Sequence, residues 1–166
     1  VKLGVDQVIM ATLTREQLEE RLAALHEVSL ELVRDLSLEV VLERIAELAR
    51  QQANAAYAAL GVVNAKGDLV KFIPVGMSPE DVRRTGTPPI GKGMIGAIGN
   101  ARRTIRVADI RDDERAAGFP TGHPQMSAFL GVPIMLGESL LGQIYLTNKL
   151  GGTEFTEADE RVIQTL

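Results

Sequence analysis

The sequence of 166 residues contains no cysteine. This absence excludes disulfide bonds, thiolate nucleophiles, zinc or haem held by cysteine, and a thioether-linked chromophore within this chain. A bound cofactor would need other ligands. Only two histidines are present, which narrows the candidates for a metal or haem ligand.

The sequence also lacks a basic excess and a long apolar run. Its formal net charge of -4 gives no electrostatic reason to expect nucleic acid as a partner. The longest apolar run, residues 129–136, is far shorter than the roughly 20 residues of a membrane-spanning helix. No basic and then apolar signal peptide opens the chain. We therefore predict a cytoplasmic protein that does not insert into membranes.

Length and composition indicate one globular domain with flanking segments. Apolar residues make up 45% of the chain and charged residues 24%. We assign residues 1–13 to a lead-in or a cloning remnant and residues 14–166 to a single domain, with its core at 37–155. The helical pattern of residues 156–166 has no glycine stop, so we expect a truncated output helix and a longer parent protein.

Residues 14–36 predict a helix with a leucine seam. Thr14 and Gln17 form a capping-box pair at its start. The seam recurs at alternating spacings of four and three, at Leu18, Leu22, Leu25, Ser29, Leu32 and Leu36. Two interpretations are open: an amphipathic helix packed on its own domain, or the seam of a parallel dimer.

The rest of the chain mixes helical and strand patterns, which predicts an α+β fold with antiparallel strand pairs. Pro133 lies within one strand pattern and indicates an edge or a bulge there. In chain order, we predict a helix at 37–54, strands at 57–63 and 69–75, short helices at 78–86 and 91–100, a strand at 104–110, a charged loop at 111–115, strands at 128–136 and 140–147, and a helix from 156.

Residues 91–96 match the G-x-G-x-x-G pattern of dinucleotide sites. That reading needs a strand immediately before the pattern, and Pro88 and Pro89 stand there instead. We interpret the glycines as allowing a short helix to begin and to pack closely against the sheet.

One loop holds the best candidate for a cofactor ligand. His123 stands between Gly122 and Pro124, and the proline favours extended backbone at the histidine. An imidazole on a restrained loop suits a ligand to a metal or cofactor. Further along, Tyr145 alternates with apolar neighbours in a strand pattern, so we expect it on one face with Gln143 and Thr147, and Ile144 and Leu146 on the other.

The chain matches the N-K…F-x-x-x-D-E pattern of many GAF sensory domains at Asn148-Lys149, Phe155 and Asp159-Glu160. The order of the predicted helices and strands also resembles that of GAF domains. The resemblance implies a central antiparallel sheet with the N- and C-terminal helices on one face. A ligand pocket made by short helices and loops would lie on the other. We interpret the motif itself as structural, because Lys149 and Asp159 can pair and fix the last strand against the last helix.

From about residue 18 to 166 the chain is most similar to the haem-binding first GAF domains of mycobacterial dormancy sensor histidine kinases of the DevS and DosT type. The segments that carry this resemblance are Tyr57–Val62, Gly91–Gly93, Gly118–Pro120, His123–Met126, Phe129–Pro133 and Gly142–Thr147. It implies that His123 ligates the iron of haem b on the proximal side and that Tyr145 can hydrogen-bond a gas on the distal side. It also implies that Gly61 leaves the path to the iron open. Apolar lining is expected from Phe72, Met94, Met126 and Phe129.

Three functional hypotheses follow. The first is a sensory domain that binds haem b and senses O2, NO, CO or redox state. It would belong to a signalling protein of the sensor histidine kinase class. The second is a GAF domain that binds another small ligand, such as a cyclic nucleotide, and the third is a ligand-free module for dimerisation or signal relay. We do not expect an enzyme, because no paired carboxylates or nucleophile and base pair occur at a usable spacing. Expected partners are a second copy, through the N- and C-terminal helices, and a downstream output domain that would carry any kinase activity.

Overall fold

A computed structural model describes residues 37–86, 92–119 and 121–166 of the chain. The predicted helix at 14–36, with its leucine seam, and the lead-in at 1–13 lie outside the described residues. Residues 38–166 form one compact unit, which makes most of its contacts within itself.

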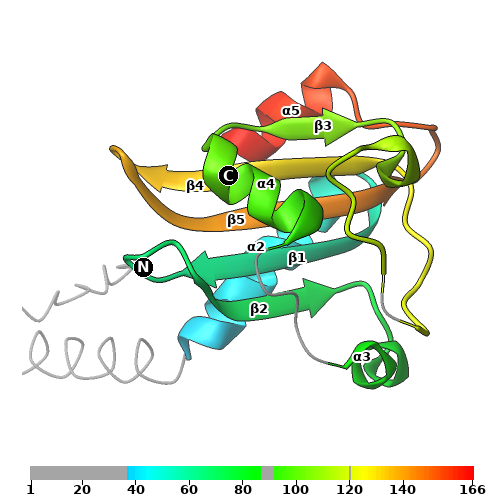
Figure 1. The fold of residues 1–166 in the computed structure, drawn as a ribbon, viewed down its shortest axis with the longest axis horizontal. Coiled ribbons are helices and arrows are strands. Elements are labelled where there is room, and N and C mark those ends of the chain that lie inside the picture. The colour runs from blue at the N-terminus through cyan, green and yellow to red at the C-terminus, as the bar shows by residue number, and fades with distance from the viewer. Residues whose placement is uncertain (1–36, 87–91, 120) are drawn as a thin grey trace, which may run out of the picture. The chain divides into compact units, whose positions relative to one another are not determined.

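The unit is built on a five-stranded sheet with the strand order β2-β1-β5-β4-β3 (Figure 1). All neighbouring strands are antiparallel. The strands are β1 (Ala55–Val63), β2 (Leu69–Val75), β3 (Ile105–Val107), β4 (Phe129–Leu136) and β5 (Ser139–Lys149). The long strands β1 and β5 lie side by side within the sheet, each with a neighbouring strand on both sides.

Two helices cover one face of this sheet. α2 (Leu38–Gln52) and α5 (Glu157–Gln164) bury their apolar sides against alternate residues of β1, β4 and β5. The largest fully buried side chains of this layer are Leu60, Leu130, Leu146 and Phe155. This layer is the main hydrophobic core, and the predicted GAF arrangement, with the C-terminal helix and the helix before the first strand on one face of the sheet, is confirmed.

The opposite face carries short elements and a loop (Figure 1). α4 (Gly93–Ala101) packs there through Met94 and Ile98. α3 (Pro79–Thr85) follows β2, and a short 3-10 helix, η1 (Ile110–Asp112), follows β3. With helices on one side and short elements on the other, the predicted α+β fold is confirmed.

Local sequence signals explain where several elements begin. The Ser78 hydroxyl accepts a hydrogen bond from the Asp81 amide at 3.1 Å and Pro79 opens α3, as the cap-then-proline rule predicts. Thr156 and Asp159 form a reciprocal capping box at the start of α5. These caps satisfy amides that would otherwise lack partners in the first turn of each helix.

The strand predicted at 104–110 is wrong in length, because β3 ends at Val107. The Oδ1 atom of Asp109 accepts hydrogen bonds from the backbone amide and from Nε of Arg111, each at 2.9 Å. This local turn competes with strand pairing and starts η1.

Pro133 lies where β4 extends beyond its pairing with β3, and a bulge follows at residues 134 and 135. The predicted edge or bulge is therefore confirmed.

None of the helices in the described ranges combines the length and the apolar character that crossing a membrane requires.

Candidate functional site

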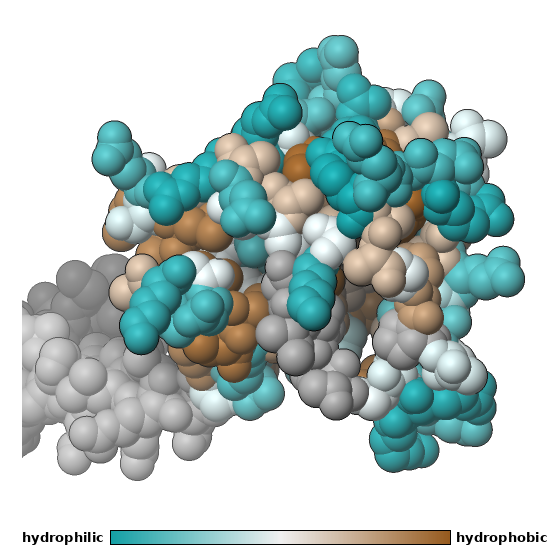
Figure 2. All heavy atoms as spheres, in the orientation of Figure 1, coloured by the Kyte–Doolittle hydropathy of each residue, from teal (hydrophilic) through white to brown (hydrophobic). Residues whose placement is uncertain are grey.

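A cavity of about 490 Å³ lies on the face of the sheet that α4 covers in part. Its lining comes from β1, β2, β4, β5, α3, α4, η1 and the loop that precedes β4. The lining is mainly apolar, and the volume is that of a small-molecule site. Seen from this side, hydrophilic residues occupy most of the outer edge and apolar residues reach the surface between them (Figure 2).

The residues predicted for the site gather around this cavity. Six of them line it: His123, Tyr145, Phe72, Met94, Met126 and Phe129. Gly61 does not line it but lies in β1 beside Tyr145. A Cβ atom at position 61 would lie 3.2 Å from the Tyr145 hydroxyl oxygen and 2.6 Å from Cδ1 of Leu69. A larger side chain at 61 would therefore press on the tyrosine.

His123 is half-buried in the cavity wall. Its Nδ1 lies 2.8 Å from the carbonyl oxygen of Pro124. Because a carbonyl oxygen only accepts, Nδ1 carries the proton in this hydrogen bond, which leaves Nε2 as the nitrogen that can ligate a metal. Phe119 stacks on the imidazole with ring centroids 4.7 Å apart. The ring is thus held in the tautomer that ligates metals through Nε2.

The loop after His123 is fastened to the end of β5 by Asn148. The Asn148 Oδ1 accepts from the Ser127 amide at 2.8 Å, and its Nδ2 donates to the Gln125 carbonyl at 2.9 Å. Asn148 has a left-handed backbone with φ of 59°, which asparagine tolerates better than most residues. These bonds fix the segment that joins the histidine to β4.

Lys149, the next residue, contacts α5 and the turn after α2 instead of the histidine loop. Its Nζ donates to Asp159 Oδ1 at 2.8 Å and to the Ala53 carbonyl at 2.9 Å. Burial alone would raise the pKa of Asp159, but hydrogen bonds from Lys149 and Thr156 hold that pKa below its ordinary value. The predicted pair between the last strand and the last helix is confirmed, so this part of the motif is structural.

A row of polar side chains forms the cavity side of β5. Gln143, Tyr145 and Thr147 are 3%, 4% and 6% exposed, and each has an oxygen with no hydrogen-bond partner among the described residues. Their alternation with Ile144 and Leu146, which belong to the main core, confirms the predicted faces of this strand. Burial raises the pKa of Tyr145, so its phenol stays neutral and remains a donor.

Within the described ranges, no group of three or more histidine, aspartate or glutamate side chains comes together that could hold a metal ion. A metal held at His123 would therefore take its remaining ligands from a cofactor, from solvent or from methionine. The lining contains a second potential ligand type, the thioethers of Met77, Met94 and Met126.

The family model described as GAF domain, GAF_2, matches residues 35–166. The chain belongs to the GAF domain family. GAF domains are sensory, regulatory modules of signalling proteins. The predicted fold and its general sensory class are therefore confirmed, while the haem-binding subtype stays a prediction.

Solved GAF domains share the fold. The GAF domain of a phosphoenolpyruvate-protein phosphotransferase from Coxiella burnetii is 22% identical, with a TM-score of 0.63, over 86% of this chain and 84% of that one. A domain of a putative two-component sensor histidine kinase from Sinorhizobium meliloti is 17% identical, with a TM-score of 0.51, over 78% and 84%. At these identities the likeness concerns the fold alone.

A curated relative extends the comparison in sequence. The alpha subunit of the rod cGMP-specific 3',5'-cyclic phosphodiesterase from Bos taurus is 29% identical over 77 residues, which cover 45% of this chain. The match spans only 9% of that relative's length.

Proposed function

We propose that this GAF domain binds haem b in the cavity through His123 and responds to a diatomic gas, O2, NO or CO, or to the redox state of the iron. The observation that carries the proposal is the hydrogen bond from His123 Nδ1 to the Pro124 carbonyl. It leaves Nε2 available at the wall of an apolar cavity. Neutral imidazole is a common axial ligand of haem iron.

The residues around the cavity fit the needs of such a group. Phe119 limits rotation of the His123 ring by stacking on it. Phe72 and Phe129, with ring centroids 6.0 and 6.4 Å from that of Tyr145, supply apolar surface that excludes water from the tyrosine. The Tyr145 hydroxyl has no hydrogen-bond partner among the described residues, and a turn of the side chain toward the cavity would let it donate a hydrogen bond to a ligand. Haem, when bound, supplies an iron centre that can take up a gas.

A route from this site to an output domain is available through β5. Tyr145 lies on this strand, Asn148 at its end holds the histidine loop, and Lys149 holds α5. We propose that a change at the cavity reaches α5 by this route and passes to an output domain, in a dimer of a sensor histidine kinase. Such coupling requires two states that both sites bias.

A second candidate is a cyclic nucleotide. The partial match to a cGMP-specific phosphodiesterase favours it, and so does Lys92, a cation among the lining residues that could face a phosphate. Tyr145 and Thr147, the two residues of the polar row that line the cavity, could hydrogen-bond a base or a sugar. The third hypothesis, a ligand-free module, depends on the leucine pattern outside the described residues.

The test is a titration with hemin followed in the visible spectrum. We expect a Soret band that shifts on reduction and on addition of CO in the wild-type domain, and its loss in His123→Ala. His26→Ala is the matched control, because it removes the other histidine of the chain and should leave the band unchanged. Added imidazole should restore a Soret band in His123→Ala if the lost group is the iron ligand.

Two results would overturn the proposal: no Soret band in the wild type, or equal binding by wild type and His123→Ala. Calorimetric titration with cGMP in the same buffer tests the second candidate. The relay through Tyr145 should be abandoned if Tyr145→Phe changes neither gas affinity nor oxidation rate nor downstream output.

A further inference from the structure

We propose that methionines in the cavity wall are modification sites: a peroxide oxidises Met77 and Met126 to methionine sulfoxide, and this lowers the affinity of the cavity for apolar ligands. The inference goes beyond the haem proposal and does not depend on it, because it concerns the wall of the cavity and holds for any apolar ligand. It gives the domain a second response, to an oxidant, at the same site.

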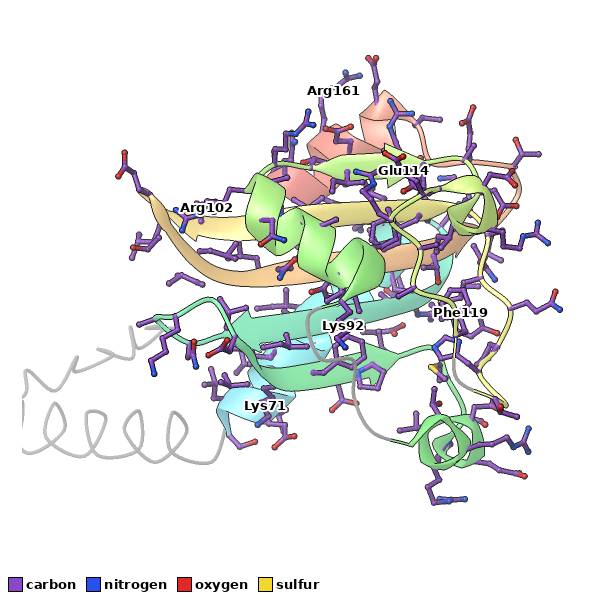
Figure 3. The ribbon with its side chains drawn as sticks, viewed as in Figure 1. Lys71, Lys92, Arg102, Glu114, Phe119 and Arg161 are labelled. Carbon is purple, nitrogen blue, oxygen red and sulfur yellow. The ribbon has the colours of Figure 1, made fainter. Side chains whose placement is uncertain are left out.

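Three of the five methionines in the sequence line this one cavity. Met77 comes from the segment between β2 and α3, Met94 from α4 and Met126 from the loop before β4. Figure 3 marks two other lining residues, Lys92 at the start of α4 and Phe119 in the same loop as Met126, which show two sides of the cavity. Because the chain has no cysteine, thioethers are its only sulfur groups.

The three thioethers differ in their access to solvent. Met77 and Met126 are half-buried. Met94 is only 6% exposed and belongs to the buried cluster that also holds Phe129 and Tyr145. An oxidant must reach the sulfur atom, so Met77 and Met126 should react first and Met94 last.

The reaction is the transfer of one oxygen atom from hydrogen peroxide to sulfur. The thioether sulfur attacks one peroxide oxygen, and the S–O bond forms as the O–O bond breaks. The other oxygen leaves as hydroxide, which takes up the remaining proton and becomes water. Sulfur loses two electrons and the peroxide gains them. The apolar side chain thereby becomes a polar sulfoxide, whose oxygen accepts hydrogen bonds.

This change of polarity acts on a lining that is mainly apolar. Water can hydrogen-bond the sulfoxide oxygen while the cavity is open. An apolar ligand that enters must displace this water without offering a donor in its place, which costs free energy. We therefore expect oxidation of Met77 and Met126 to weaken the binding of an apolar ligand by about 10-fold.

The test follows the binding of an uncharged apolar dye, phenylnaphthylamine, by fluorescence before and after treatment of the protein with hydrogen peroxide. Mass spectrometry of peptides locates each sulfoxide. In the wild type we expect oxidation at Met77 and Met126 before Met94, together with the loss of affinity. Methionine sulfoxide reductases A and B should restore the affinity, because they reduce the two sulfoxide epimers.

The double variant Met77→Leu, Met126→Leu should bind the dye as the wild type does and keep its affinity after treatment, since leucine has a similar volume and cannot be oxidised in this way. Met135→Leu is the matched control, because Met135 is 36% exposed in β4 and does not belong to the described lining of the cavity. This control should lose affinity on oxidation as the wild type does.

The double variant Met77→Gln, Met126→Gln places polar side chains at both positions without any oxidant. It should bind the dye about 10-fold more weakly than the wild type. Urea denaturation checks that this variant is folded, and the leucine variant keeps the inference testable if it is not.

Three results would overturn the inference: no dye binding by the untreated wild type, oxidation of Met77 and Met126 no faster than that of Met94, or an equal loss of affinity in the wild type and the leucine double variant. None of these measurements uses hemin, so this inference and the haem proposal can fail or stand independently.

Discussion

The two faces of the sheet use the same strands for different purposes. Toward α2 and α5, β5 contributes Ile144 and Leu146, which pack among apolar side chains with almost no exposure. On the opposite face β5 presents Gln143, Tyr145 and Thr147, of which Tyr145 and Thr147 line the cavity. Their side-chain oxygens lack hydrogen-bond partners among the described residues. The helix-covered face thus supplies stability, and the cavity face keeps hydrogen-bonding capacity for a ligand at some cost in stability. Variants of neighbouring residues can test this contrast.

Leu146→Ala should have the largest effect. Leu146 is fully buried between β1, β4 and the helices, and its truncation leaves a space that the layer cannot fill. We expect a loss of about 2–5 kcal/mol in the free energy of unfolding, measured by urea denaturation. A loss well under 1 kcal/mol would mean that this face is no better packed than the cavity face.

Asp159→Asn should cost about 2 kcal/mol at neutral pH, because it removes a charged hydrogen-bond partner of the poorly exposed Lys149. The pKa of Asp159 is lower in the folded than in the unfolded protein, so its contribution is complete above the unfolded value of about 4 and disappears as pH falls through the folded one. Urea midpoints of wild type and variant should therefore converge below pH 4. Parallel curves down to pH 2 would contradict this.

Asn148→Gly tests the link between the histidine loop and β5. Glycine keeps the left-handed backbone but removes the hydrogen bonds to Gln125 and Ser127, so we expect a loss of about 1 kcal/mol. The Ser127 amide should also exchange with solvent faster. Asn148→Ala removes the same bonds and adds backbone strain, so it should be less stable than Asn148→Gly. Unchanged exchange at Ser127 would show that other contacts hold the loop.

Tyr145→Phe should have the smallest effect on stability, with the opposite sign. Its hydroxyl is buried without a protein partner, so its removal should leave the free energy of unfolding unchanged or raise it by up to about 1 kcal/mol. Urea denaturation without ligand measures this. A clear loss of stability would show that the hydroxyl is satisfied in the folded protein, and it would weaken the contrast between the two faces.

Much of the fold was predictable because its signals are local. Ser78-Pro79 and Thr156 with Asp159 mark helix starts by hydrogen bonds within a few residues, and both predictions are confirmed. The alternation in residues 143–147 gave the correct faces of β5 for the same reason. The end of β3 was missed because the side chain of Asp109 turns the backbone where the apolar pattern continues.

The candidate site was predictable only in part, because it depends on contacts between distant segments. The loop around His123 and the alternation around Tyr145 pointed to these two residues, and the resemblance gave them roles at a haem. No periodicity in the sequence relates Phe119 to the imidazole on which it stacks. Thr147 was placed on the correct face without being recognised as part of the lining. Lys92 was read only as part of a glycine pattern. Its position beside the cavity became visible once α4 was placed against the sheet.

The polar row of β5 also has a consequence for folding. A shift of β5 by one residue against β1 would exchange its two sets of side chains between the faces. Gln143, Tyr145 and Thr147 would then enter a layer that contains only hydrocarbon, where no ligand or solvent can reach them. The shift would also take Ile144 and Leu146 out of the main core, so the alternation along β5 favours the native strand alignment.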